Sequence, residues 1–127
     1  MILDQLNALR ADFPECHTVA LADISSGTVL CVSAKQKHPQ ERLDALCSTA
    51  AELLDGDAAQ AFSKALEMPK TATLQESVVM AKLETYIFLR SPQDRMEAML
   101  CICSANIDID TFLQGARSSL KTIANAQ

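Results

Sequence analysis

The sequence predicts an α/β (α+β) three-layer sandwich, a five-stranded antiparallel sheet with helices on both faces. Segments with strand composition come first as a pair and then as a group of three, and the short polar linkers within each group favour antiparallel neighbours. Segments with a helical apolar repeat precede, separate and follow these groups. Two strand segments are apolar at nearly every position, which indicates a sheet that is covered on both sides. The predicted order is α-β-β-α-β-β-β-α.

Five segments rich in β-branched and other apolar residues are predicted to form the strands. The first and the last are the two that are apolar at nearly every position, so we expect them to pair at the centre of the sheet. The third mixes polar residues 75–77 with apolar residues 78–80, and this polar content fits an edge. The predicted strands cover residues 17–24, 28–34, 74–81, 85–91 and 98–105.

Three regions carry apolar residues at spacings of three and four and are predicted to be helical. The first region spans residues 2–12. The second begins at residue 40 and is interrupted at residues 55–57. There, either one helix continues through the glycine or a second begins with an aspartate cap, and we favour two pieces. The last helix is capped by Asp108 or Asp110 and lies at the end of the sequence.

Length and charge narrow the class of protein. The 127 residues match the size of one domain, so we expect a single domain over 1–127. The net charge is −5, and Lys and Arg are scattered singly, which predicts no binding to nucleic acid or to an anionic membrane surface. No apolar stretch approaches the ~20 residues that cross a bilayer, and the first residues do not resemble a signal peptide.

The cysteines indicate a reducing compartment. There are five, an odd number, and they lie within apolar patterns and not in loops. This is typical of buried thiols in a cytoplasmic protein and not of a disulfide framework.

Candidate chemistry is sparse. Cys101 and Cys103 share one face of a predicted strand, which would suit a thiol pair or half of a metal site, but two small buried side chains explain them better. Cys16 and His17 are neighbours on an extended segment and point to opposite faces, so they do not form a nucleophile–base pair. The glycine spacing matches no nucleotide-binding loop. We therefore expect no enzyme activity, no catalytic residues, no metal and no cofactor.

Asp23 is a carboxylate inside a strand that otherwise reads as buried. We expect it to accept hydrogen bonds from backbone N–H groups of the turn at residues 25–27. This is a structural role and not a catalytic one.

Three stretches, together with the element order, resemble the dynein light chain roadblock family. They are TVALADISSGTVLCVS, LDALCSTAAELL, and TYIFLRSP followed by EAMLCICSANIDIDTFLQGARSSL, with Asn106 in the last turn. The sequence is identified as a divergent, bacterial-like member. The resemblance implies a profilin-like sandwich and a dimer. Two differences stand out: residues 56–72 form a longer link than is usual, in a region that borders the family's dimer interface, and the first turn lacks the common Asp-Gly.

The resemblance also implies a function in protein binding. Roadblock modules associate with small Ras-like GTPases in bacteria and with motor or signalling complexes in eukaryotes. We therefore expect a scaffold that pairs with itself and binds or regulates such a GTPase or a larger assembly.

The expected contact surface is the third strand together with the flank of the central helix. A poorly charged edge strand invites pairing with another chain. The apolar stripe of the central helix is wide, so part of it could extend the contact to a partner helix. Packing of a wide stripe on a wide sheet explains it equally well. The expected interface residues are Leu46, Leu53, Gln75, Glu76, Val78, Val79 and Met80.

Two other functions stay open. Profilin-like sandwiches also occur as small-molecule sensory domains, and here a pocket between sheet and helix would be lined by residues such as Phe88, Met99 and Cys101. The other is a minor thiol-redox role of Cys101 and Cys103.

Overall fold

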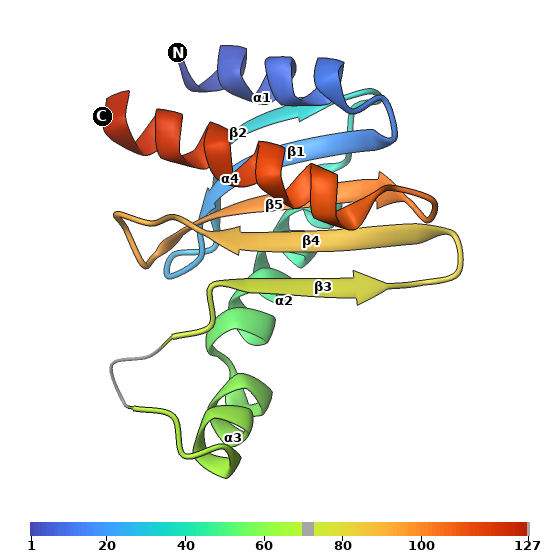
Figure 1. Ribbon diagram of the computed structural model, residues 1–127. Helices are drawn as coiled ribbons and strands as arrows, with labels where there is room; N and C mark the ends of the chain where they lie inside the picture. The colour runs from blue at the N-terminus through green and yellow to red at the C-terminus, as the bar shows by residue number, and fades with distance from the viewer. Residues whose placement is uncertain (70–72, 127) are drawn as a thin grey trace.

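A computed structural model of the protein describes residues 1–69 and 73–126. All five predicted strands are present and form one antiparallel sheet in the order β2-β1-β5-β4-β3 (Figure 1). The strands are β1 (Cys16–Asp23), β2 (Thr28–Ala34), β3 (Glu76–Met80), β4 (Glu84–Arg90) and β5 (Glu97–Ser104). The helices are α1 (Ile2–Asp12), α2 (Gln40–Asp55), α3 (Asp57–Ala65) and α4 (Ile109–Ala126).

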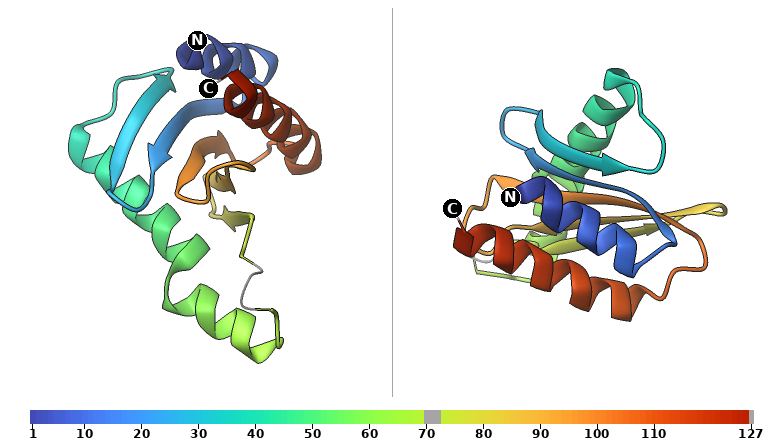
Figure 2. Two further views of the ribbon diagram at one scale, coloured as in Figure 1. Left: turned by 90° about the vertical axis from the view of Figure 1, so that its left-hand side faces the viewer. Right: turned by 90° about the horizontal axis from the view of Figure 1, so that it is seen from above.

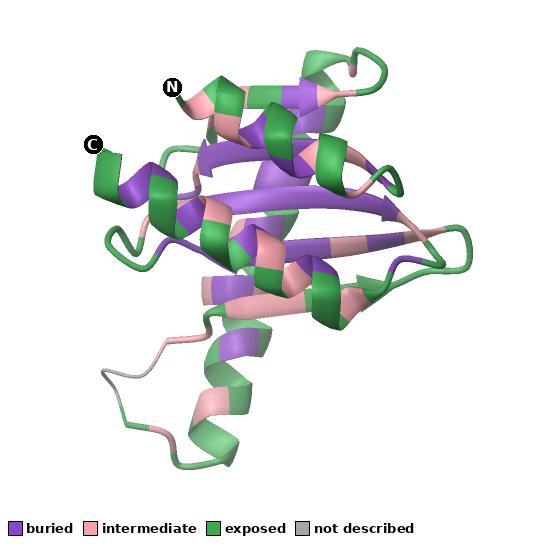
Figure 3. Ribbon diagram, turned by 45° about the horizontal axis from the view of Figure 1, so that its top comes forward, coloured by how far each residue is buried: buried purple, intermediate pink, exposed green. Residues whose placement is uncertain are grey.

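Helices cover both faces of the sheet, as expected. Helices α1 and α4 lie side by side on one face, and α2 crosses the other (Figure 2). Strands β1 and β5 pair at the centre, which confirms the expectation drawn from their continuous apolar sequence. Both are buried along nearly their whole length because each faces helices on either side (Figure 3).

Each face of the sheet has its own apolar core. Under α1 and α4, Leu6 and Phe112 pack against residues such as Met99 and Cys101. Under α2, smaller residues including Ala20 face Leu54 and Phe88. Helix α2 packs Leu and Ala side chains on a sheet surface that is itself rich in Ala. Among the described residues, Phe88 of the sheet is the one large aromatic side chain buried in this core.

The first hairpin turns as predicted. The Asp23 carboxylate accepts hydrogen bonds from the N–H groups of Ser25 and Ser26, at 2.9 and 3.2 Å. Gly27 has a φ of +73°, a conformation that glycine adopts without the steric strain other residues meet.

The second helical region is divided, as favoured above, and Gly56 is the joint. Its backbone is extended, with φ −74° and ψ −173°, and it separates α2 from α3. A Cβ atom at this position would overlap the backbone carbonyl oxygen of Glu52, so a residue with a side chain does not fit here without a shift. Beyond the joint, α3 projects past the β3 edge of the sheet (Figure 1).

Strand β3 is shorter than the predicted 74–81. The chain approaches the sheet with Leu74, whose side chain packs on the core under α2. Gln75 already accepts a hydrogen bond from the N–H of Arg90, so the ladder begins one residue before the regular strand. At its other end, Ala81 donates to the carbonyl of Glu84 and closes the hairpin to β4.

Candidate interaction site

Strand β3 is an edge of the sheet, as expected from its mixed composition. It pairs with β4 on one side, from Glu76 opposite Leu89 to Met80 opposite Thr85. No strand of the described residues lies on its other side. Its backbone groups on that side are therefore available to another chain.

The hydrogen-bond pattern fixes which backbone groups face outward. The N–H of Arg90 bonds to the carbonyl of Gln75, and the N–H of Ala81 bonds to that of Glu84. Because bonding alternates along an antiparallel strand, the odd-numbered residues between them bond to β4. The N–H and C=O groups of Glu76, Val78 and Met80 consequently point away from the sheet.

Apolar side chains line this edge. Val78 and Val79 are each 37 % exposed and Met80 is 71 % exposed. Val78 lies opposite Ile87, on the face that α4 covers, and Val79 lies opposite Tyr86, on the face of α2. The edge therefore offers hydrophobic surface on both faces of the sheet.

The other residues expected at the interface differ in exposure. Gln75 is exposed and Glu76 is half-buried. On α2, Leu53 is half-buried beside the core, and Leu46 is buried within it. Leu46 still lines the groove described next, so its side chain packs on the sheet and also forms a wall of an open surface.

An apolar groove runs between α2 and the β3 side of the sheet. It has a volume of about 350 Å³ and is open to solvent. Small exposed residues of α2, Ala45 and Thr49, form one wall, and Val79 and Phe88 contribute to the other. Arg42 lies in the same groove and forms a partly exposed ion pair with Glu84 at 3.7 Å.

Glu76 ties β3 to α4. Both oxygens of its carboxylate accept hydrogen bonds from Arg117, at 2.5 and 2.6 Å. This contact raises the pKa of the Arg117 guanidinium, because Glu76 stabilises its charged form. The bidentate contact holds the edge strand against the helix layer.

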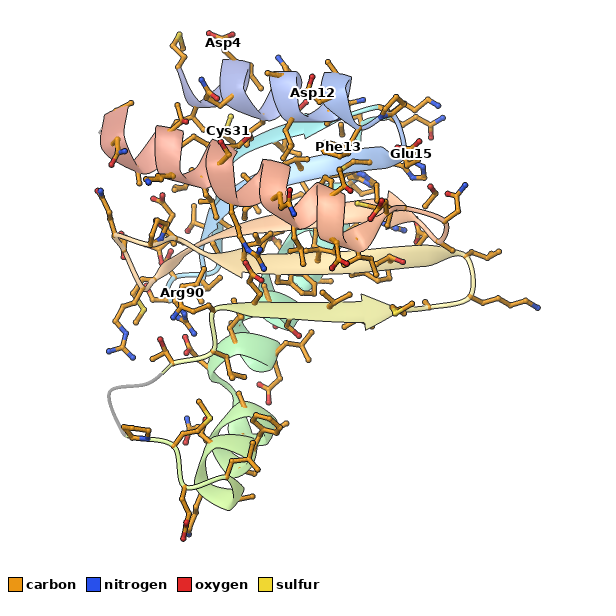
Figure 4. All side chains as sticks on the ribbon, in the orientation of Figure 1. Asp4, Asp12, Phe13, Glu15, Cys31 and Arg90 are labelled. Atoms are coloured by element: carbon orange, nitrogen blue, oxygen red, sulfur yellow. The ribbon has the colours of Figure 1, made fainter. Side chains whose placement is uncertain are left out.

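Arg90 organises the other end of the site. Its buried side chain lies where β4 ends, close to the C-terminus of α2 (Figure 4). The guanidinium donates to both carboxylate oxygens of Asp55, at 2.7 and 3.1 Å, and to the carbonyl of Leu54. It also donates to the carbonyls of Leu74 and Arg95. One side chain thus connects the end of α2 with the segment that leads into β3.

The sheet has a second free edge at β2, which the sequence reasoning did not single out. Leu30 is 52 % exposed there and Val32 is 36 % exposed. They alternate along β2 with less exposed residues, an alternation that the segment TVLCVSA does not reveal because both sets contain apolar residues.

Three of the thiols meet in the core under α1 and α4. Cys16 lies opposite Cys103 across β1 and β5, and its thiol donates a hydrogen bond to the carbonyl oxygen of Thr18 at 3.5 Å. The neighbouring thiols of Cys101 and Cys103 lower the pKa of Cys16. Burial raises the pKa of Cys101, and the contact with Cys16 raises that of Cys103. None of the three is more than 2 % exposed, so they pack as small core residues.

The pocket expected for a small-molecule sensor does not form around Phe88, Met99 and Cys101. Phe88 belongs to the core under α2, whereas Met99 and Cys101 belong to the core under α1 and α4. Residues 99 and 101 alternate with residue 100 along β5, and Leu100 is the one that faces α2 with Phe88. The three residues therefore lie on opposite faces of the sheet.

Within residues 1–69 and 73–126, no group of three or more His, Cys, Asp and Glu side chains is arranged to hold a metal ion. In the same part of the structure, no helix is long and apolar enough to cross a bilayer.

The fold and its free edge define a known class, the roadblock-type α/β sandwich. The gliding protein MglB from Thermus thermophilus superposes with a TM-score of 0.78 and 17 % identity, over 98 % of this chain and 86 % of that one. A Roadblock/LC7 domain from Streptomyces avermitilis gives a TM-score of 0.77 and 11 % identity, over 98 % and 95 % of the two chains. MglB from Myxococcus xanthus superposes with a TM-score of 0.73 and 12 % identity, over 99 % of this chain and 96 % of that one.

These superpositions confirm the fold that the sequence resemblance implied. One further structure with the same fold is of MglB in a tetrameric arrangement. No protein-family model and no curated protein sequence matches the chain significantly.

Proposed function

We propose that this protein is a non-catalytic interaction module of the cytoplasm that forms a homodimer through β3. The observation that carries the proposal is the free edge of β3, where exposed Val78, Val79 and Met80 accompany outward-facing backbone groups. An uncovered apolar edge is prone to pair with another strand. A second copy of the same strand is a suitable partner because the edge is self-complementary.

A two-fold axis at Val78, the middle one of the three outward-facing residues, lets all three take part in the pairing. In an antiparallel, two-fold arrangement, Val78 lies opposite Val78 of the second copy, and Glu76 lies opposite Met80. The two sheets then continue as one, and the C-terminal halves of the two α2 helices approach each other near the axis, with Leu53 at the contact.

Sedimentation tests this pairing. The purified protein is expected to be a dimer at micromolar concentration, and Val78→Lys is expected to produce monomers because it places two like charges opposite each other at the axis. Leu83→Lys is a suitable control, since Leu83 is 79 % exposed at the hairpin tip and lies outside the strand. A dimer that is unchanged by Val78→Lys would overturn the proposal.

The second part of the proposal is a partner, a small Ras-like GTPase or a larger assembly that contains one. Its support is the roadblock-type fold together with the family resemblance of the sequence. Purification of the tagged protein from its native cells, with GDP or with a non-hydrolysable GTP analogue present, tests this. Retention of a GTPase in a nucleotide-dependent way supports the proposal, and retention of none counts against it.

A small-molecule sensory function has weaker support. An open hollow of about 830 Å³ lies between α3 and the loops beside the sheet and is lined by residues such as Asp55, Lys64 and Arg95. A metabolite screen by thermal shift separates the two functions, since a ligand that binds only the folded state raises its melting temperature in a saturable way.

A further inference from the structure

Helix α3 has an apolar stripe that is exposed. Its residues at spacings of three and four share one face of the helix, and Phe62 and Leu66 at its end are 52 % and 59 % exposed. Ala59 alone in α3 is buried. The exposed apolar residues of this stripe, from the start of α3 to the residue after it, are Ala58, Ala61, Phe62, Ala65 and Leu66.

The position of α3 relates this stripe to the β3 edge. Helix α3 packs against α2 and not on the sheet. It projects beyond β3, on the side of the sheet where α2 lies (Figures 1 and 2). A strand added to β3 by another chain would therefore extend the sheet over α3.

We propose that α3 is an arm that packs into the groove of a second copy of this chain, between that copy's α2 and the β3 side of its sheet. The inference rests on the edge-paired dimer proposed above. A two-fold axis through Val78, perpendicular to the sheet, carries each α3 beneath the partner's sheet on its α2 face. The open groove beside Ala45 and Thr49 is on that face.

The chemistry of the two surfaces is complementary. The rotation reverses the direction of the helices, so α3 runs antiparallel to the α2 that it meets. Phe62 then reaches the middle of the groove, where the small residues Ala45 and Thr49 leave room for its ring. Glu67, just after α3, approaches Arg42 at the start of α2, which is half-exposed in the free chain.

The surface area that a stable dimer must bury also favours a second copy of this chain as the partner of α3. A stable interface buries roughly 800 Å² from each partner. The strand that would pair is short, with five residues in β3. Two symmetric arms make the helical contact twice and add apolar surface to that of the strands.

A membrane surface suits this stripe less well. Helices that bind membrane surfaces carry an excess of Lys and Arg on the polar face. The polar residues of α3 include Asp57 and a single basic residue, Lys64, and the whole chain has a net charge of −5.

The first test compares Phe62→Glu with Lys64→Glu. The first places a charge in the proposed contact. The second makes a larger change of charge on the opposite side of the same helix. Phe62→Glu is expected to raise the dissociation constant of the dimer at least about tenfold, whereas Lys64→Glu leaves it within about twofold. Circular dichroism melts verify that both variants fold, as the exposure of both side chains predicts.

The second test is a cross-link between copies. One variant carries Phe62→Cys and another carries Ala45→Cys, both with Cys31→Ser to remove the half-exposed native thiol. When the two are mixed and mildly oxidised, a disulfide that joins the two different variants is expected. Lys64→Cys in place of Phe62→Cys is expected to give none.

The outcomes separate this inference from the proposed function. If Val78→Lys dissociates the dimer while Phe62→Glu and the cross-link have no effect, the inference is overturned, the edge-paired dimer stands, and the stripe has another occupant. If Phe62→Glu acts and Val78→Lys does not, the edge pairing is overturned. A chain that is monomeric at all concentrations overturns both.

Discussion

Arg90 is the residue on which the site most depends, because its guanidinium satisfies a carboxylate and three carbonyls at once. Arg90→Lys is expected to lower the free energy of unfolding by about 2 kcal/mol, since a lysine ammonium cannot match this planar set of contacts. Urea denaturation measures the change. Arg95→Lys is the control: Arg95 is exposed, so it should change stability by less than about 0.5 kcal/mol. Equal stability of the two variants would contradict the role given to Arg90.

The hydrogen bonds of the Asp23 carboxylate predict that the free energy of unfolding depends on pH. The hydroxyl of Ser25 and the backbone N–H groups of the turn lower the pKa of this carboxyl below its usual value. A group whose pKa is depressed in the fold stabilises it above the unfolded pKa of about 3.9, and this contribution disappears as the pH falls through the folded pKa. Asp23→Asn, which does not titrate, is therefore expected to lose less stability between about pH 6 and about pH 3. Urea denaturation at each pH measures the free energy of unfolding of both proteins. Equal losses of stability in the wild type and in Asp23→Asn would refute this prediction.

Single residues also show where sequence reasoning stops. The role of Asp23 was predictable because its partners are two and three residues away. The meeting of Cys16 with Cys103 was not, since it depends on the register between β1 and β5. Four of the five hydrogen bonds of Arg90 were missed for the same reason, because they join it to Leu54, Asp55 and Leu74, which lie 16 to 36 residues away.

At the level of elements, Gly56 determines how α3 leaves α2. Gly56→Ala is expected to destabilise the protein by about 1–3 kcal/mol, because the added Cβ overlaps the carbonyl of Glu52. An alanine that straightened the joint into one helix would instead gain about 1 kcal/mol of helix propensity. Circular dichroism distinguishes these two outcomes, because it reports both the melting temperature and the helix content of the variant. A gain of stability with longer helix would show that the joint is not held by packing.

The order and type of the elements were predictable because apolar periodicity reports directly which faces are buried. The central position of β1 and β5 followed from their two-sided apolar sequence, and the edge position of β3 from its polar residues. The direction of α3 was not predictable. The repeat through Ala58, Phe62 and Ala65 predicts a helix but not its direction, and its stripe is exposed where α3 continues past the edge of the sheet.

At the scale of the whole molecule, the chain is a roadblock-type sandwich whose proposed contact surface is an edge of the sheet and not a pocket. The free edge of β3 and the helix α3 lie at the same end of the molecule (Figure 1), and residues of α2, β3, β4 and β5 line the groove. Joined in a dimer, they would form a continuous surface from two chains. We expect a GTPase or assembly partner to recognise that combined surface, so Val78→Lys should weaken partner retention together with dimerisation.

Amide hydrogen exchange of β3 shows whether two copies pair through this strand. The N–H groups of Glu76, Val78 and Met80 point away from β4, whereas those of Ser77 and Val79 bond to it. Residue-resolved exchange by NMR, at protein concentrations above and below the dimer's dissociation constant, is expected to show slow exchange of the three outward amides only in the dimer. In Val78→Lys the remaining outward amides should exchange fast at both concentrations. Fast exchange of the three amides in a protein that sediments as a dimer would show that the copies meet elsewhere, and would contradict pairing through β3.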